Sequence, residues 1–185
     1  MIKLKDLLYE MSSPNLLIPR RVEGRMEKYI QSKIKEYIKN NNVGDFDISG
    51  LGLTKLPTSL KDLKIGGTFD CSNNSLKFLT NSPVVVGLDF NCNNNLLEDT
   101  LAGAPTSVGG SFDCSNNKLT SLEGAPTCVK NFYCSRNSLT SLDGLIRDDG
   151  VRLSVGGGFW CNNNKVKFTK KQVRAVCDVK GKIHV

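Results

Sequence analysis

Thiols are the most reactive groups that recur in this 185-residue chain, which contains seven cysteines and one histidine. A cysteine can act as a nucleophile, bind a metal ion or form a disulfide, depending on its exposure and its neighbours. Here the count is odd and no CxxC pair occurs. Five of the seven occupy one repeating position, at Cys71, Cys92, Cys114, Cys134 and Cys161.

A repeating position favours packing over chemistry. Zinc would need further ligands, and the single histidine, His184, cannot complete a ladder of thiols. On parallel strands about 4.8 Å apart, equivalent cysteines lie close but are poorly aimed for a disulfide. We therefore expect reduced, buried cysteines that act as small apolar residues, which favours a cytoplasmic setting.

Other catalytic patterns are equally weak. The paired carboxylates Glu98-Asp99 and Asp148-Asp149 are expected in surface loops. The glycines of VGGS (108–111) and VGGG (155–158) match turn chemistry, and no Walker loop occurs. We expect no enzymatic activity, no metal and no cofactor.

The cysteine position belongs to a tract that returns five times, in which Phe, Cys, Asn and an aliphatic residue keep fixed spacings. The copies are FDCSNNSL (69–76), FNCNNNLL (90–97), FDCSNNKL (112–119), FYCSRNSL (132–139) and FWCNNNKV (159–166), preceded by a looser FDISGLGL (46–53). From Ile48 to Cys161, successive cysteine positions lie 23, 21, 22, 20 and 27 residues apart. Self-similarity at this period predicts a solenoid, which builds a surface instead of a pocket.

Two further positions support this prediction. The asparagine position is expected to hydrogen-bond the backbone of a bend, and the aliphatic position, from Leu53 to Val166, to be buried. The return segments GAPTSVGGS (103–111) and GAPTCVKN (124–131) contain Gly and Pro for tight turns and leave no room for a full helix.

This pattern resembles the leucine-rich repeat family, LxxLxLxxNxLxxL, with Phe and Cys in two leucine positions. The first copy, GLGLTKLPTSLKDLKI (50–65), looks like the short repeats of bacterial secreted effectors, and FDCSNNKLTSLEGAP (112–126) looks like repeats encoded by bacterial viruses. The resemblance implies an α/β solenoid with parallel strands on a concave face, a helical N-terminal cap and a helix-strand C-terminal cap. It implies little about activity.

Four segments follow from these patterns. Residues 1–18 contain a short amphipathic stretch, and 19–42 a capping helix with Val22, Met26, Ile30, Ile34 and Ile38 on one side. Residues 43–166 form six repeats, and 167–185 a C-terminal cap with a helix from about 170 to 178 after Thr169. No 18-residue apolar run is present, and the first residues do not resemble a secretory signal.

Strand alternation directs Phe and Cys inward and the residue between them outward. This outward column reads Asp47, Asp70, Asn91, Asp113, Tyr133, Trp160. Because Tyr, Trp and Arg carry much interface energy, we predict a protein-binding patch at Tyr133, Arg136 and Trp160, with Asp113 beside it. The 145–155 insertion is expected to bring Arg152 within reach of the patch. Alternatively, the aromatic residues cover a strand edge or pack under that insertion.

The sequence thus favours a non-enzymatic protein-protein interaction module, and the viral resemblance suggests a phage product acting on a host factor in the bacterial cytoplasm. One alternative is a phage structural protein packaged in the virion interior, whose N-terminal peptide is cleaved after Glu10. Another is a nucleic-acid adaptor using the basic C-terminal cap, with Lys170, Lys171 and Arg174 at phosphates. Residues 165–185 carry seven Lys or Arg against one acidic residue, so this segment supplies most of the net charge of +7 of the chain.

Overall fold

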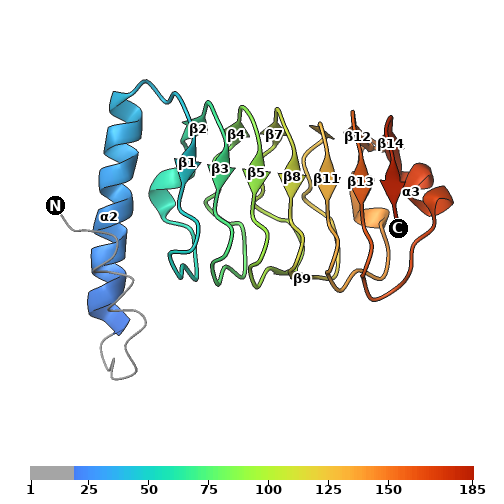
Figure 1. Cartoon of the computed structure of the whole chain (residues 1–185), viewed down its shortest axis with the longest axis horizontal. Helices are drawn as coiled ribbons and strands as arrows, with labels where there is room; N and C mark the ends of the chain where they lie inside the picture. The colour runs from blue at the N-terminus through green and yellow to red at the C-terminus, as the bar shows by residue number, and fades with distance from the viewer. Residues whose placement is uncertain (1–18) are drawn as a thin grey trace.

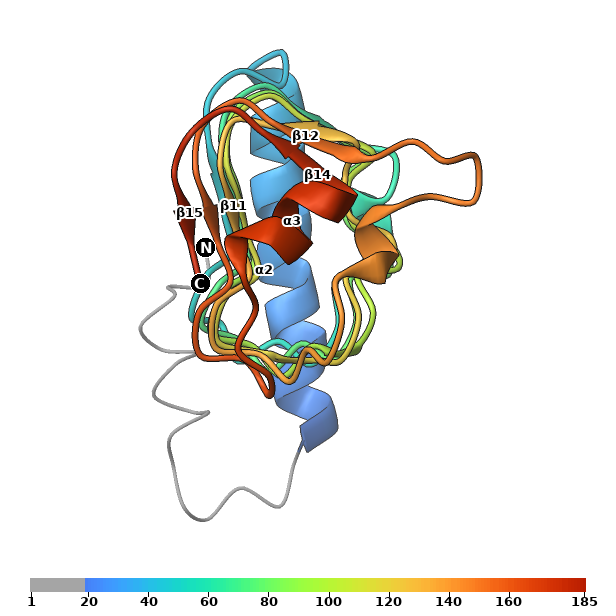
Figure 2. The same cartoon turned by 90° about the vertical axis from the view of Figure 1, so that its right-hand side faces the viewer.

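The computed structural model describes residues 19–185, with side chains from residue 24 onward. The amphipathic stretch expected within 1–18 and the cleavage after Glu10 lie outside the described residues. Between α2 (Pro19–Lys39) and α3 (Lys170–Val176), short strands stack one behind another along the long axis of the molecule (Figure 1). Viewed along that axis, successive turns of chain project closely onto one another (Figure 2).

The main sheet has seven parallel strands in the order β1-β3-β5-β8-β11-β13-β15. These strands are β1 (Phe46–Asp47), β3 (Phe69–Asp70), β5 (Phe90–Asn91), β8 (Phe112–Asp113), β11 (Phe132–Tyr133), β13 (Phe159–Trp160) and β15 (Ile183–His184). Consecutive strands pair in register, Phe beside Phe from β1 to β13. The predicted parallel-strand solenoid is confirmed.

Shorter sheets form the rest of each turn. They contain β2 (Lys64–Ile65), β4 (Val85–Val86) and β7 (Ser107–Val108); β6 (Glu98–Asp99) and β9 (Lys118–Leu119); and β10 (Cys128–Val129), β12 (Leu153–Val155) and β14 (Cys177–Val179). Single 3-10 turns lie at Thr58–Leu60 and Asp143–Leu145.

Phenylalanine forms the spine of the core. The six Phe side chains of β1 to β13 are at most 2% exposed, and neighbouring rings stack with centroids 5.2 to 6.0 Å apart. Two residues later, Ile48 in the first repeat and the cysteine in each of the other five are buried, and the cysteines are free thiols. Both positions point inward because strand side chains alternate with a period of two.

Asparagine closes the bend after each strand. Asn95 accepts the Leu76 N–H at 3.0 Å and donates to the carbonyls of Cys71 and Cys92 at 3.0 and 3.1 Å. The equivalent bonds recur at Asn74, Asn117, Asn137 and Asn164. These side chains satisfy backbone groups that no sheet reaches, as predicted.

The N-terminal helix covers the first rung. Met26, Ile30, Ile34 and Tyr37 are buried, and the Tyr37 ring meets Phe46 edge-on at 5.3 Å. Ile38 was expected on the same face but is 53% exposed, because Tyr37 takes the core position one residue earlier.

The glycines before the strands lie at bends, and close packing against the preceding turn is what requires one of them. Gly109 of the VGGS segment does not have a positive φ. Instead, a Cβ on Gly109 would collide with the carbonyl oxygen of Gly87 on the preceding turn. The residue is required for close backbone stacking at a corner.

The last repeat departs from its predicted register. Val166 was assigned to the buried aliphatic position but is 37% exposed, while Phe168 is buried at 3%. Thr169 then caps α3 through a reciprocal capping box with Gln172. The chain passes through β14 and returns as β15, which pairs with β13 and adds a seventh rung to the main sheet.

Candidate functional site

The strand face is the side of the seven-stranded sheet opposite the Phe and Cys core. In the first four rungs its outward side chain closes a local turn. Asp113 Oδ1 accepts the Ser115 N–H at 2.9 Å, and Asp47, Asp70 and Asn91 make the same bond two residues ahead. These residues therefore have a structural role as Asx turns.

The last three rungs replace this turn with aromatic side chains. Tyr133 and Trp160 stack with ring centroids 4.3 Å apart, and Trp160 stacks on His184 at 4.9 Å. Tyr133, Trp160 and His184 form what we call the aromatic ladder. It lies outside the core on β11, β13 and β15.

Gly158 makes room for this ladder. A Cβ at position 158 would overlap the far edge of the Trp160 indole, so the ring lies back over the glycine backbone. Equivalent positions one and two rungs earlier carry Asn131 and Ser111. The local sequence is thus adapted to hold the indole flat on the sheet.

His184 was not among the predicted site residues. Its signal was present, since Ile183-His184-Val185 repeats the inward-outward-inward alternation of Phe-Trp-Cys at 159–161. Ile183 is buried and His184 is exposed, as that pattern requires.

The aromatic ladder does not lie beneath the insertion. The insertion forms a hairpin, 146–152, in which Ile146 bridges Arg152 and the Arg147 N–H donates to the Val151 carbonyl at 2.9 Å. In Figure 2 this orange hairpin projects to the right, away from β11 and β15 on the left. The prediction that Arg152 lies within reach of Tyr133 is therefore wrong. The extra residues enter the return path, on the side of the solenoid remote from the sheet.

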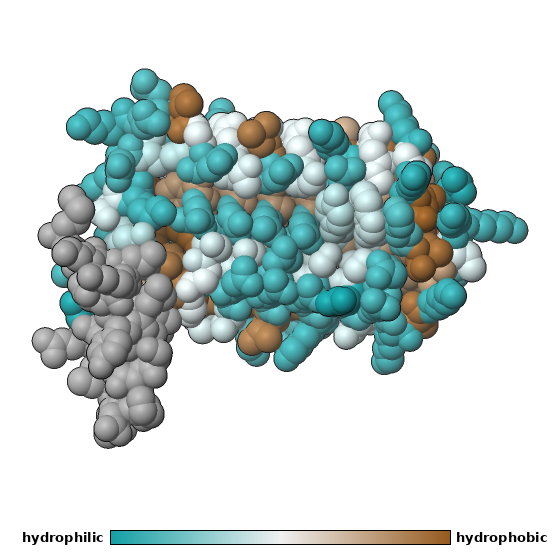
Figure 3. Space-filling model, viewed as in Figure 1, coloured by the Kyte–Doolittle hydropathy of each residue, from teal (hydrophilic) through white to brown (hydrophobic). Residues whose placement is uncertain are grey.

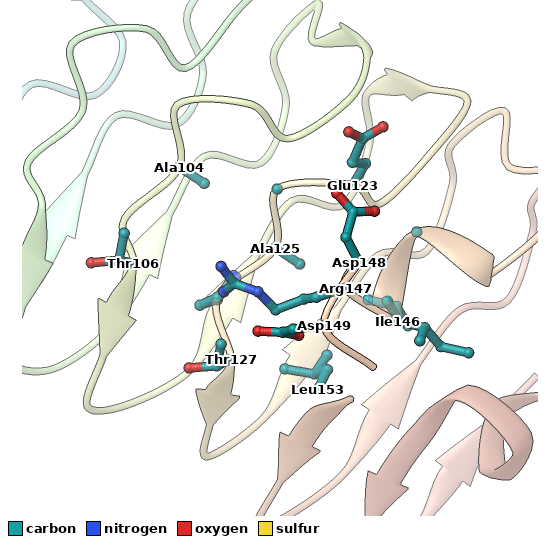
Figure 4. Close-up of a pocket in the computed structure, with 14 residues that line it drawn as sticks. Ala104, Thr106, Glu123, Ala125, Thr127, Ile146, Arg147, Asp148, Asp149 and Leu153 are labelled. Carbon is teal, nitrogen blue, oxygen red and sulfur yellow. The ribbon is translucent and has the colours of Figure 1, made fainter. Parts of the chain in front are cut away.

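The hairpin instead walls a cavity of about 650 Å³ on the return side. Its floor is built from the stacked 104–106 and 124–127 segments (Figure 4). Arg147 reaches from the hairpin across the cavity, with Asp148 and Asp149 beside it. The Asp148-Asp149 pair is thus exposed on a surface hairpin, as predicted, while Glu98 of the other pair binds Lys77 at 3.2 Å.

Arg136 lies exposed in the bend that follows β11, three residues after Tyr133. Its φ of 55° places it in the left-handed region, where the equivalent residues of the other repeats are Gly50, Asn73, Asn94, Asn116 and Asn163. Asparagine tolerates this conformation better than arginine. The site residue Arg136 therefore stands where a structural role would favour asparagine.

Asp113 pairs in register with Tyr133. Partial burial raises the pKa of the Tyr133 hydroxyl, and the Asp113 and Asp89 carboxylates raise it further. The aromatic ladder thus borders negative charge at its Tyr133 end. Figure 3 shows the corresponding change along the strand face, from hydrophilic rungs to a paler area near its C-terminal end.

The buried thiols are poorly suited to nucleophilic chemistry. Burial raises the pKa of Cys161 to about 11 and that of Cys177 to about 12, and it raises the pKa of Cys92, Cys114 and Cys134 well above the usual value. A thiol held in its protonated form is a weak nucleophile. Within residues 19–185, no cluster of three or more metal-ligating side chains occurs.

The predicted nucleic-acid residues Lys170, Lys171 and Arg174 are all exposed on α3. They lie at the C-terminal end of the array and do not belong to the aromatic ladder (Figure 1). The described helices include none whose length and apolar character would suit a membrane span.

Strand order, register and the recurring Phe, Cys, Asn and Leu positions define a solenoid of the leucine-rich repeat type. No protein-family model and no curated protein matches the chain. Among solved structures, the leucine-rich repeat domain of a Shigella effector is similar, with 18% identity over 95% of this chain and 94% of that chain. The TM-score of this match is 0.41.

Proposed function

We propose that this protein is a non-enzymatic scaffold that binds a protein partner through its strand face, with Tyr133, Trp160 and Arg136 at the contact and Asp113 beside them. The observation that carries the proposal is the aromatic ladder, which is displayed on the sheet surface and is not part of the core.

Displaying these aromatics has a local cost. Each earlier rung gains a turn hydrogen bond from its Asp or Asn, a bond that Tyr133 and Trp160 cannot make. Such a bond contributes about 1 kcal/mol. Their mutual stacking offsets part of this loss, and partner binding supplies a reason for the remainder.

Arg136 supports the same interpretation. Its long, charged side chain projects from the bend next to the aromatic rungs, at a position where four equivalent residues are asparagine. Arginine at such a place provides charge and stacking surface that asparagine lacks. Arg152 is not part of the contact because it lies on the hairpin at the far side, whereas His184 extends the contact by one rung.

The test compares capture of proteins from bacterial lysate by the immobilised wild-type chain and by Trp160→Ala. Bacterial lysate is chosen because the resemblance of the repeats to those encoded by bacterial viruses suggests a bacterial host factor as the partner. Trp160→Ala is expected to reduce capture of a specific partner at least tenfold, since a central aromatic anchor contributes about 2 kcal/mol or more.

Phe78→Ala is the matched control. Phe78 is also a large exposed aromatic residue, at 53%, but it lies outside the strand face. Circular dichroism verifies that both variants fold. Equal loss of capture in the two variants, or full capture by folded Trp160→Ala, contradicts the proposed site.

A further inference from the structure

Three carboxylates in the middle of the strand face are held outward by the backbone. Asp70 accepts the Ser72 N–H at 2.9 Å and Asp113 the Ser115 N–H at 2.9 Å. Asp89, one position earlier on its rung, accepts the Ser111 N–H at 2.6 Å. Each acceptor bond fixes the direction of its carboxyl group. We call Asp70, Asp89 and Asp113 the acidic strip.

None of the three forms an ion pair within the described part of the chain; the second oxygens of Asp70 and Asp113 accept side-chain N–H bonds from the neutral Asn91 and Asn93, at 3.1 and 2.9 Å. The strip also has a like charge at its N-terminal side, because Asp47 pairs in register with Asp70. Like charges facing each other on neighbouring strands are unfavourable. This negative charge stands out in a chain whose net charge is +7.

The acidic strip runs directly into the aromatic ladder. Asp113 pairs with Tyr133, and only one face of the Tyr133 ring is covered by Trp160. The other ring face is directed toward the Asp113 rung. A cation placed there would meet a carboxylate and an aromatic face together, and both attract it.

We propose that the strand face binds a cationic, extended segment of a partner protein that crosses the rungs along the long axis of the solenoid. Its Lys or Arg side chains lie over the acidic strip, and one of them contacts the Tyr133 ring. This inference rests on the proposed function and adds the chemistry of the partner to it.

The spacing suits an extended chain. Neighbouring strands are about 4.8 Å apart, so the two rungs that separate Asp70 from Asp113 span roughly 10 Å. An extended polypeptide covers this distance in about three residues. A nucleic acid does not fit this surface, because its phosphates would meet the carboxylates.

The chain itself provides variants that remove the charge and keep the turns. Asn91 occupies the position equivalent to Asp113 on the preceding rung, and its Oδ1 accepts the Asn93 N–H at 3.2 Å. Asn131 occupies the position equivalent to Asp89, and its Oδ1 accepts the Gly158 N–H at 2.9 Å. Asp89→Asn combined with Asp113→Asn should therefore fold. Asp62→Asn combined with Asp178→Asn changes the net charge equally, at exposed positions outside the strand face.

The probes are two fluorescein-labelled dodecapeptides, one of alternating arginine and serine and one of alternating glutamate and serine, titrated with the full chain in low salt. We expect the cationic peptide to bind, with Kd raised at least tenfold in Asp89→Asn/Asp113→Asn and less than twofold in Asp62→Asn/Asp178→Asn. We also expect binding to weaken steeply as salt is added.

Equal binding by the two double variants would overturn the inference, as would binding of the acidic peptide alone, which would point to the basic C-terminal end. Low-salt oligomers that dissociate in Asp89→Asn/Asp113→Asn would also overturn it, by making a second copy of this chain the occupant. If captured partner depends on Trp160 but not on Asp89 and Asp113, the proposed function stands and this inference fails.

Discussion

At position 136 the residue departs from the preference of the local backbone. The left-handed conformation after each strand costs a non-glycine residue about 1 kcal/mol, and asparagine pays least. Of the six equivalent positions, four carry asparagine and the first carries glycine, Gly50, so Arg136 is the exception.

We therefore expect Arg136→Asn to raise the free energy of unfolding by up to about 1 kcal/mol and to weaken partner capture. Urea denaturation measures the first effect. Asn116→Arg, the reverse change one rung earlier, should lower stability by a similar amount. A destabilised Arg136→Asn would show that the arginine makes a stabilising contact.

The asparagines that hydrogen-bond the backbone after the strands are the opposite case, in which the residue suits the local backbone. Asn95 is buried and bonds four backbone groups from two rungs. Asn95→Ala leaves the buried Leu76 N–H without its acceptor and removes one of the two asparagine donors from each of the Cys71 and Cys92 carbonyls, so we expect a loss of about 2–3 kcal/mol in urea denaturation.

Asn93→Ala is the comparison for Asn95→Ala. Asn93 lies half-buried two residues earlier and donates to the Asp113 carboxylate at 2.9 Å. Its replacement should cost about 1 kcal/mol or less. Similar losses in both variants would mean that burial of the bonds matters little.

At the scale of elements, the terminal helices decide where the array stops. α2 joins the first turn through the Tyr37 hydroxyl, which donates to the Asn42 carbonyl at 2.7 Å and accepts the Gly66 N–H at 2.9 Å. α3 closes the other end with Val173 and Val176 buried. Both helices bury the apolar end of a stack whose interior would otherwise meet water.

Tyr37→Phe removes only the hydroxyl and keeps the ring against Phe46. We expect a loss of about 1–2 kcal/mol, with faster amide hydrogen exchange confined to α2 and the first two rungs. Uniformly faster exchange along all rungs would show that the array unfolds as one unit even at its end.

At the scale of the molecule, the buried thiols couple stability to alkaline pH. Burial keeps the pKa of Cys92, Cys114 and Cys134 far above the ordinary value of 9.0 in the folded chain. Above pH 9 the unfolded chain therefore binds fewer protons than the folded chain, and the free energy of unfolding falls as pH rises.

We expect the free energy of unfolding, measured by urea denaturation, to decrease from pH 8.5 to 10, by up to about 1.4 kcal/mol per pH unit for each thiol that ionises only on unfolding. Cys92→Ala should make this decrease shallower. Cys128→Ala, which removes an exposed thiol, should leave the slope unchanged. Equal slopes in the wild type and both variants would rule out a thiol origin.

Much of the architecture was accessible from the sequence. The alternation of Phe46-Asp47-Ile48 and its copies specifies which side chains face inward, because successive side chains of a strand point to opposite faces of the sheet. The asparagine position and the cap at Thr169 likewise depend on neighbours a few residues away. Tyr133 and Trp160 were therefore assigned to the strand face from local pattern alone.

Tertiary structure decided the rest. The hairpin ending at Arg152 could have emerged on either side, and only the closed path of the whole turn put it opposite the sheet. The shift from Val166 to Phe168 and the pairing of His184 with Trp160 arise where the last turn must close over α3. These outcomes depend on contacts between distant segments, which a short repeating pattern does not encode.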